Sequence, residues 1–192
     1  IPIVGIERED QYICSVNTDN YMGGVQAASL LRKSNCDFLI HVNARMPETT
    51  PAYGRIKGFT DICREYNLAY DLILTHLGNT YYENKESISE LVDSWEQKYP
   101  GKKKGIFMPN DTHANVLLNI LFQKYGHLPD TYKIVGFDNS PISEEAVIPI
   151  STVGQQISCI AAEAMSLLSS LMNERKKRKP VPLKEPIHKI IT

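Results

Sequence analysis

Residues 105–111, with the sequence GIFMPND, decide the class of fold. The first four residues are an apolar run, and they pass without a break into polar residues that open a helical pattern. We expect Asp111 to cap that helix and Gly126 to stop it near residue 125. A short apolar strand that leads directly into a helix is the unit from which parallel sheets are built.

The same unit recurs along the whole chain. The predicted strands are 1–6, 12–16, 38–42, 72–75, 105–108, 132–137 and 187–191, and the predicted helices are 21–33, 55–66, 86–99, 111–125 and 158–174. The strand at 38–42 lacks polar alternation, which predicts burial on both of its faces. Alternation of strands and helices implies parallel strands joined by right-handed crossovers. The predicted fold is therefore α/β, with parallel sheets flanked by helices.

Polar residues follow most of these strands. Four of the five internal strands end in Asn or Asp, at residues 17–20, at Asn43, at residues 110–111 and at residues 138–139. Open parallel sheets bind ligands at the carboxyl ends of their strands. Asn and Asp are also ordinary helix caps and turn formers, so both roles stay open for each residue taken alone. Four such ends at one sheet edge would form a polar rim.

Composition and net charge limit which kinds of protein this chain can be. The 192 residues are 42% hydrophobic and 22% charged, which is typical of a globular protein with a real core. A net charge of -1 provides no basic field for phosphates, so any DNA contact must come from a part outside this sequence. The basic run at 175–179 would suit a nucleic-acid patch or a localisation signal. Its position before the 180–182 turn favours a helix C-terminus instead.

Signatures of catalysis and of metal binding are not found. The four cysteines are far apart and no Cys/His group has metal-ligand spacing, so we expect free thiols, no metal site and no cofactor. The sequence has no GxSxG elbow, no phosphate-binding loop and no nucleophile beside a base, so we expect no catalytic residue and no enzyme. His113, on a first helical turn, could line a cleft or simply pack. No apolar stretch approaches the ~20 residues that span a membrane.

Four segments resemble the LacI/GalR regulators and the related periplasmic sugar-binding proteins. They are VNTDNYMGG at 16–24, RIKGF at 55–59, GIFMPNDTHA at 105–114, and KIVGFDN at 133–139 followed by PISTVGQ at 149–155. Each motif alone is weak, and RxxGF arises readily by chance. Their order and spacing over nearly the whole chain make the joint resemblance specific.

The resemblance implies a type I periplasmic-binding-protein fold. In that fold two α/β subdomains flank a cleft, and the chain crosses between them three times. Residues 1–32 and 157–180 would then belong to the N-terminal subdomain, 37–150 and 185–192 to the C-terminal subdomain, and 151–156 to a crossing segment. Compared with a whole family member, the DNA-binding head and the first elements of the N-terminal subdomain are missing, so we expect an incomplete N-terminal subdomain.

The resemblance also implies a ligand site. Its residues, transferred position by position, are Asp19, Arg55, Asn110, Asp138 and Gln155. Carboxylate, amide and guanidinium groups supply the paired donors and acceptors that adjacent sugar hydroxyls require. Two alternatives stay open. Asp19 would also serve as a helix cap, and Arg55 would also suit a structural ion pair, although a cation at a helix start opposes the helix dipole.

The function implied is effector sensing. The chain would be the sensing domain of a bacterial, cytoplasmic transcriptional repressor that binds a sugar or similar metabolite and controls DNA binding allosterically. Its partners would be the effector, a second copy of the chain, and DNA through a missing N-terminal domain, with no membrane. An extracytoplasmic sugar-binding receptor for transport or chemotaxis is the alternative, and upstream sequence would separate the two. A third interpretation, an enzyme built on this type of sheet, has no support other than the fold class itself.

Overall fold

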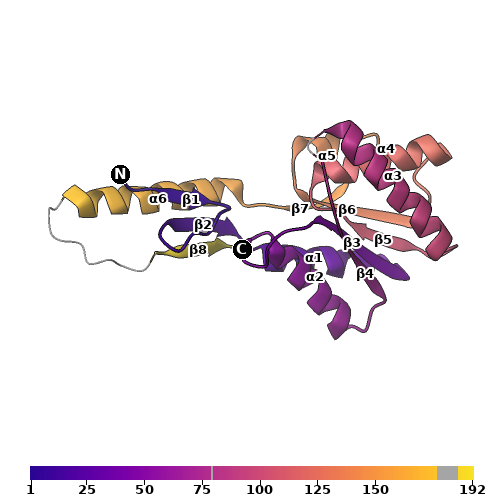
Figure 1. The fold of residues 1–192 in the computed structure, drawn as a ribbon, viewed down its shortest axis with the longest axis horizontal. Helices are drawn as coiled ribbons and strands as arrows, with labels where there is room; N and C mark the ends of the chain where they lie inside the picture. Colours follow the sequence, from indigo (N-terminus) through magenta and orange to yellow (C-terminus); the bar gives the residue numbers. More distant parts are fainter. Residues whose placement is uncertain (79, 177–185) are drawn as a thin grey trace.

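Two parallel β-sheets flanked by helices form the protein, in a computed structural model that describes residues 1–78, 80–176 and 186–192 (Figure 1). The larger sheet has the order β4 (Tyr70–Thr75), β3 (Phe38–Ala44), β5 (Lys104–Phe107), β6 (Tyr132–Asp138), β7 (Ser151–Gly154). The smaller sheet has the order β1 (Val4–Ile6), β2 (Cys14–Thr18), β8 (His188–Ile191). The helices are α1 (Asn20–Lys33), α2 (Tyr53–Glu65), α3 (Tyr81–Lys98), α4 (Asp111–Tyr125), α5 (Pro141–Glu145) and α6 (Ile157–Lys176).

All of these strand pairs are parallel, and the predicted α/β class is confirmed. Strand β3 lies inside the larger sheet and is covered on both faces, as its unbroken apolar sequence predicts. Ile40 and Val42 pack into a cluster with residues of α3 and α4, while Leu39 packs into a second cluster with residues of α1 and α2. The two helix pairs therefore form the outer layers, and the sheet lies between them (Figure 1).

The smaller sheet is covered by α6. Val16 of β2 packs against Ile160, Ala164 and Leu167 on that helix, and all four side chains are buried. Figure 1 shows α6 running from the end of β7 back along the smaller sheet. No helix in the described residues is long and apolar enough to cross a membrane.

The structure corrects the expected division into subdomains at three places. Strand β8 pairs with β2, so residues 187–192 lie with the smaller sheet and not with the C-terminal subdomain. Helix α1 buries Ala27, Ala28 and Leu31 against the larger sheet, so it does not belong with residues 1–18. Residues 151–154 form strand β7 beside β6 rather than a crossing segment.

Two smaller differences concern local signals. Helix α3 begins at Tyr81 and not near residue 86, because Thr80 and Glu83 form a capping box that starts the helix a full turn earlier. The short helix α5 was not predicted. The side chains of the basic run at 175–179, the turn at 180–182 and the boundaries at residues 180 and 185 lie outside the described residues.

Candidate ligand-binding site

The carboxyl ends of the five strands of the larger sheet form one edge, and four of the five predicted ligand residues lie along it. Asp138 is the last residue of β6, Asn110 follows β5, and Gln155 follows β7. Arg55 comes from the first turn of α2, whose N-terminus lies after β3. The sheet thereby brings together residues that are up to 100 positions apart in the sequence.

Arg55 reaches across the edge towards β5 and β6. Its Nη1 donates a hydrogen bond to the carbonyl oxygen of Pro109 at 2.8 Å, and its guanidinium lies 4.3 Å from the ring centroid of Phe137. Burial lowers the pKa of Arg55, while the carboxylates of Asp138 and Glu7 oppose that shift. The Nε of Arg55 is buried and has no hydrogen-bond partner within the described residues. A buried donor without a partner is costly, which makes this N–H available to a ligand oxygen.

Asp138 is the carboxylate of the site. Its φ of 104° is in a region that residues other than glycine rarely adopt, so the turn after β6 holds it in an unusual backbone conformation. Gln155 Nε2 donates to Asp138 Oδ1 at 2.6 Å. Burial raises the pKa of Asp138, and the hydrogen bond from Gln155 and the charge of Arg55 both lower it. Asp138 is thus a half-buried carboxyl group, with Oδ1 bonded to Gln155 and Oδ2 without a hydrogen-bond partner among the described residues.

Gln155 connects this edge to the smaller sheet. Its Oε1 lies 3.3 Å from the Thr18 hydroxyl, and that hydroxyl is 2.7 Å from Glu7 Oε1. A hydroxyl has one proton to donate, and the shorter contact to Glu7 is the stronger bond. The carbonyl oxygen of Gln155 therefore keeps the capacity to accept a hydrogen bond from a ligand hydroxyl.

Asn110, which was predicted to bind ligand, is the N-terminal cap of α4. Its Oδ1 accepts from the backbone N–H of His113 at 3.0 Å and from His113 Nδ1 at 2.6 Å. Because Oδ1 is only an acceptor, Nδ1 of His113 carries the proton and Nε2 is a buried acceptor, without a partner in the described part of the chain. Burial lowers the pKa of His113, which favours this neutral form.

Asp111 has a different role from the one predicted. Asn110 caps α4, and the prediction that Asp111 caps it is wrong. The buried carboxylate of Asp111 accepts from Ser140 N at 2.7 Å, from Ser140 Oγ at 3.0 Å and from Thr152 Oγ1 at 2.5 Å. These bonds join the turn after β6 to strand β7, so Asp111 fixes the segment that immediately follows Asp138.

Asp19 makes no direct bond to the other four predicted residues in the described part of the chain. It caps α1, where its Oδ1 accepts from the backbone N–H of Met22 at 2.9 Å. It also lines a pocket of ≈ 370 Å³ together with Thr18, Phe137 and Gln156. Within the described residues no hydrogen bond or ion pair joins it to Arg55 or Asp138. Of its two predicted roles, the helix cap is therefore the one for which the structure shows a hydrogen bond.

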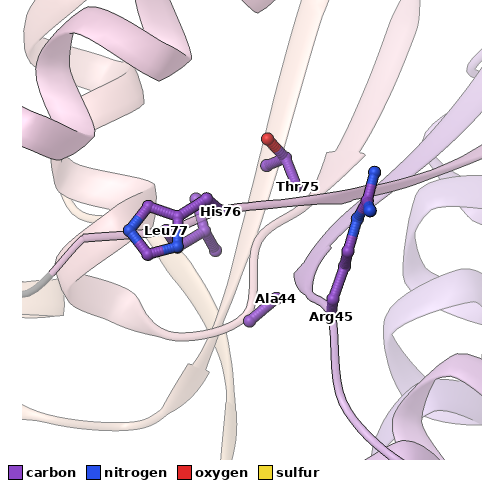
Figure 2. A pocket seen from close by; sticks show the side chains of 5 residues that line it. All are labelled: Ala44, Arg45, Thr75, His76 and Leu77. Carbon is purple, nitrogen blue, oxygen red and sulfur yellow. The ribbon is translucent and has the colours of Figure 1, made fainter.

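A second pocket lies at the other end of the same edge. It has a volume of ≈ 480 Å³ and is lined by Ala44 and Arg45 after β3 and by Thr75, His76 and Leu77 after β4 (Figure 2). The described residues contain no group of three or more His, Cys, Asp or Glu side chains that could hold a metal ion.

Comparison with known proteins identifies the family. Residues 30–192 match the family of periplasmic binding protein-like domains. The chain belongs to this family. This periplasmic binding protein-like domain is 26% identical over 170 residues to the ribose operon repressor of Halalkalibacterium halodurans, an alignment that covers 88% of the chain and 49% of the repressor. It is 28% identical over 161 residues to the sucrose operon repressor of Streptococcus mutans, covering 83% of the chain and 47% of that repressor.

Solved structures agree with this. The domain superposes with a TM-score of 0.77 and 28% identity on a periplasmic binding protein/LacI transcriptional regulator from Alkaliphilus metalliredigens QYMF complexed with D-xylulofuranose. That match covers 99% of this chain and 67% of the other chain. The predicted resemblance to LacI-type regulators is thus confirmed, and the chain spans about half the length of the curated relatives that it matches.

Three residues of the site were missed by sequence reasoning. Glu7 follows the first strand with a φ of 53°, and nothing in its local sequence marks it as a partner of Thr18. Phe137 was assigned only as an apolar strand residue, yet its ring supports the Arg55 guanidinium. His41 is fully buried, close enough to Arg55 to be affected by its charge, and its Nδ1 is hydrogen-bonded to the Phe107 carbonyl at 3.0 Å. Burial, opposed by that bond, lowers the pKa of His41 to about 3.

Proposed function

We propose that this domain senses a sugar or a similar polyhydroxylated metabolite and passes that signal to a transcriptional repressor of which it is a part. The observation that carries the proposal is the convergence of Arg55, Asp138 and Gln155 at one sheet edge, where the buried Nε of Arg55 has no hydrogen-bond partner among the described residues. Adjacent hydroxyl groups present a donor and an acceptor each, which this set of guanidinium, carboxylate and amide groups complements.

The relatives support the ligand class and the biological role. The curated relatives are named as ribose and sucrose operon repressors. The related structure from Alkaliphilus metalliredigens holds D-xylulofuranose. By analogy, this chain would act without catalysis, as part of a cytoplasmic homodimer that contacts DNA through a separate N-terminal domain.

The mechanism follows from the connection between the two sheets. Gln155 touches Asp138 on the larger sheet and Thr18 on the smaller one. A ligand that bonds to Asp138 and Gln155 would therefore favour one relative orientation of the sheets. Such a ligand changes operator affinity only if it binds the two orientations with different affinity.

The test is a thermal-shift and calorimetric screen of the chain against neutral sugars, including ribose, sucrose and cellobiose. We expect a sugar that stabilises the wild type, and we expect Asp138→Ala and Arg55→Ala to weaken its binding at least tenfold, since hydrogen bonds to charged groups contribute about 1.5–3 kcal/mol each. Asp130→Ala is the matched control, because Asp130 is an exposed carboxylate outside the site. Unchanged affinity in both site variants would refute the site assignment.

A further inference from the structure

The pocket at the ends of β3 and β4 has a chemistry different from that of the Asp138 cluster. Its lining contains the guanidinium of Arg45, the hydroxyl of Thr75 and the imidazole of His76, together with two small or apolar side chains. Among the described residues that line the pocket there is no carboxylate. Figure 2 shows Arg45 and His76 on opposite sides of the pocket, with Thr75 between them. The guanidinium is a positive charge that only donates hydrogen bonds, and the hydroxyl and the imidazole can each donate one as well.

Arg45 is held in place and still has donors to offer. Its Nε donates to the carbonyl oxygen of Leu74 at 3.2 Å, which fixes the guanidinium against the end of β4. Arg45 has no ion pair within the described residues. The two terminal amino groups of the fork are the part of arginine that binds phosphate or carboxylate in a bidentate manner.

Strand register places this pocket within reach of a ligand bound at Asp138. Ala44 pairs with Thr75, so both are at the same height on the sheet edge. One row of paired residues crosses the sheet from β3 through β5 to β6, and it consists of His41, Phe107 and Val135. Ala44 on β3 and Asp138 on β6 both lie three positions beyond this row, so they are at the same height on the sheet edge. With neighbouring strands ~4.8 Å apart, Asp138 and Ala44 are about 10 Å apart along the edge. That span is longer than a single sugar ring.

We propose that Arg45, Thr75 and His76 form an anion subsite, which takes a phosphate or carboxylate group of an effector whose sugar part binds at Asp138 and Gln155. The inference rests on the proposed function for the position of the sugar, and it names the effector as an acidic or phosphorylated sugar. Arg45 holds the oxyanion through its fork, and Thr75 and His76 donate to the remaining oxygens. The carboxylate end of the edge and the cationic end then bind opposite ends of one ligand.

The experiment compares esters with their neutral parents by calorimetry on the full chain. The probes are ribose with ribose 5-phosphate, glucose with glucose 6-phosphate, glucuronate as the carboxylate, and inorganic phosphate. We expect one phosphate ester or glucuronate to bind about 10- to 100-fold more tightly than its neutral parent, since hydrogen bonds to charged groups have that magnitude. Arg45→Gln should remove most of this difference. Arg64→Gln is the charge-matched control, because Arg64 is an exposed cation paired with Asp61 on α2.

The outcomes separate this inference from the proposed function. Preference for the ester over glucuronate identifies phosphate as the group bound, and the reverse identifies carboxylate. An advantage that Arg45→Gln leaves intact, or no binding of any anion in the panel, overturns the subsite. Neutral sugars that bind in an Asp138-dependent way would in that case still support the proposed function. Anions that bind through Arg45 but independently of Asp138 would support the subsite and refute the sugar site.

Discussion

Two glycines allow α1 and α2 to pack backbone to backbone, and this contact positions Arg55. A Cβ at Gly24 would lie 2.1 Å from the carbonyl oxygen of Arg55, and a Cβ at Gly58 would lie 2.0 Å from the carbonyl oxygen of Tyr21. The atoms that it would meet are backbone, so the clash cannot be relieved by a side-chain rotation. Gly24→Ala must push the two helices apart by more than 1 Å to restore an ordinary contact.

The size of the effect follows from two opposing contributions. Alanine is favoured over glycine by about 1 kcal/mol in a helix interior. Overpacking of a close contact costs about 3 kcal/mol at the upper end of its usual range. The net loss for Gly24→Ala is therefore about 2 kcal/mol, which corresponds to a decrease in melting temperature of about 4–8 °C for a chain of this size. Because the carbonyl of Arg55 moves, ligand affinity should decrease as well.

Urea unfolding followed by fluorescence of Trp95 measures this, since Trp95 is the one tryptophan and is 1% exposed. Gly126→Ala is the control. It has a φ of +77° and open space around its Cβ, so it should lose about 1 kcal/mol to backbone strain and keep full ligand affinity. If Gly24→Ala were as stable as the wild type, or more stable by the helix propensity of alanine, the close-packing argument would be wrong.

Three further predictions concern polar groups below the site. Asp111→Ala leaves three donors without their acceptor and should cost about 3–5 kcal/mol in urea unfolding, a loss that a merely exposed carboxylate would not produce. His41 is neutral in the folded state, where its pKa is lowered to about 3. In the unfolded chain the same imidazole has its ordinary pKa of 6.5 and binds a proton below that pH. The contribution of His41 to the free energy of unfolding should therefore be fully present above pH 6.5 and should decrease by about 1.4 kcal/mol per pH unit as the pH falls towards 3. The His41→Leu variant should show a flatter dependence of stability on pH. An equally steep profile in that variant would contradict the assignment. Asn110→Ala removes the cap of α4 and should lower the free energy of unfolding by about 1 kcal/mol, and Thr80→Ala at the cap of α3 should have the same effect. Calorimetry should show weaker ligand binding in Asn110→Ala alone.

Local patterns were sufficient for most of the elements. The apolar runs and the Asn and Asp residues that follow them predicted parallel strands, their burial and a polar edge, and the structure has all three. They were sufficient because periodicity and capping depend on residues within a few positions of each other. The early start of α3, the short helix α5 and the strand β7 were missed, and for α3 the reason is that its capping box lies ahead of the apolar pattern.

The site was predictable only in part. Asp138 and Asn110 stand at strand ends, where a polar residue is visible in the sequence, and Arg55 was identified through a family motif. The partners Glu7 and Phe137 carry no such signal, because their roles depend on contacts with residues far along the chain. Arg45 and His76 follow two strands that are neighbours only in the folded sheet.

The sequence by itself determined most of the strands and helices, the α/β class and the polar ends of the strands, since each of these follows from spacing within one segment. The tertiary structure alone decided that β8 pairs with β2, that α1 packs on the larger sheet, and that Gln155 spans both sheets. An apolar strand carries the same donors and acceptors whichever neighbour it has. The neighbour that pairs with each strand is decided only in the folded chain, where all backbone hydrogen bonds and the packing of the core must be satisfied at once.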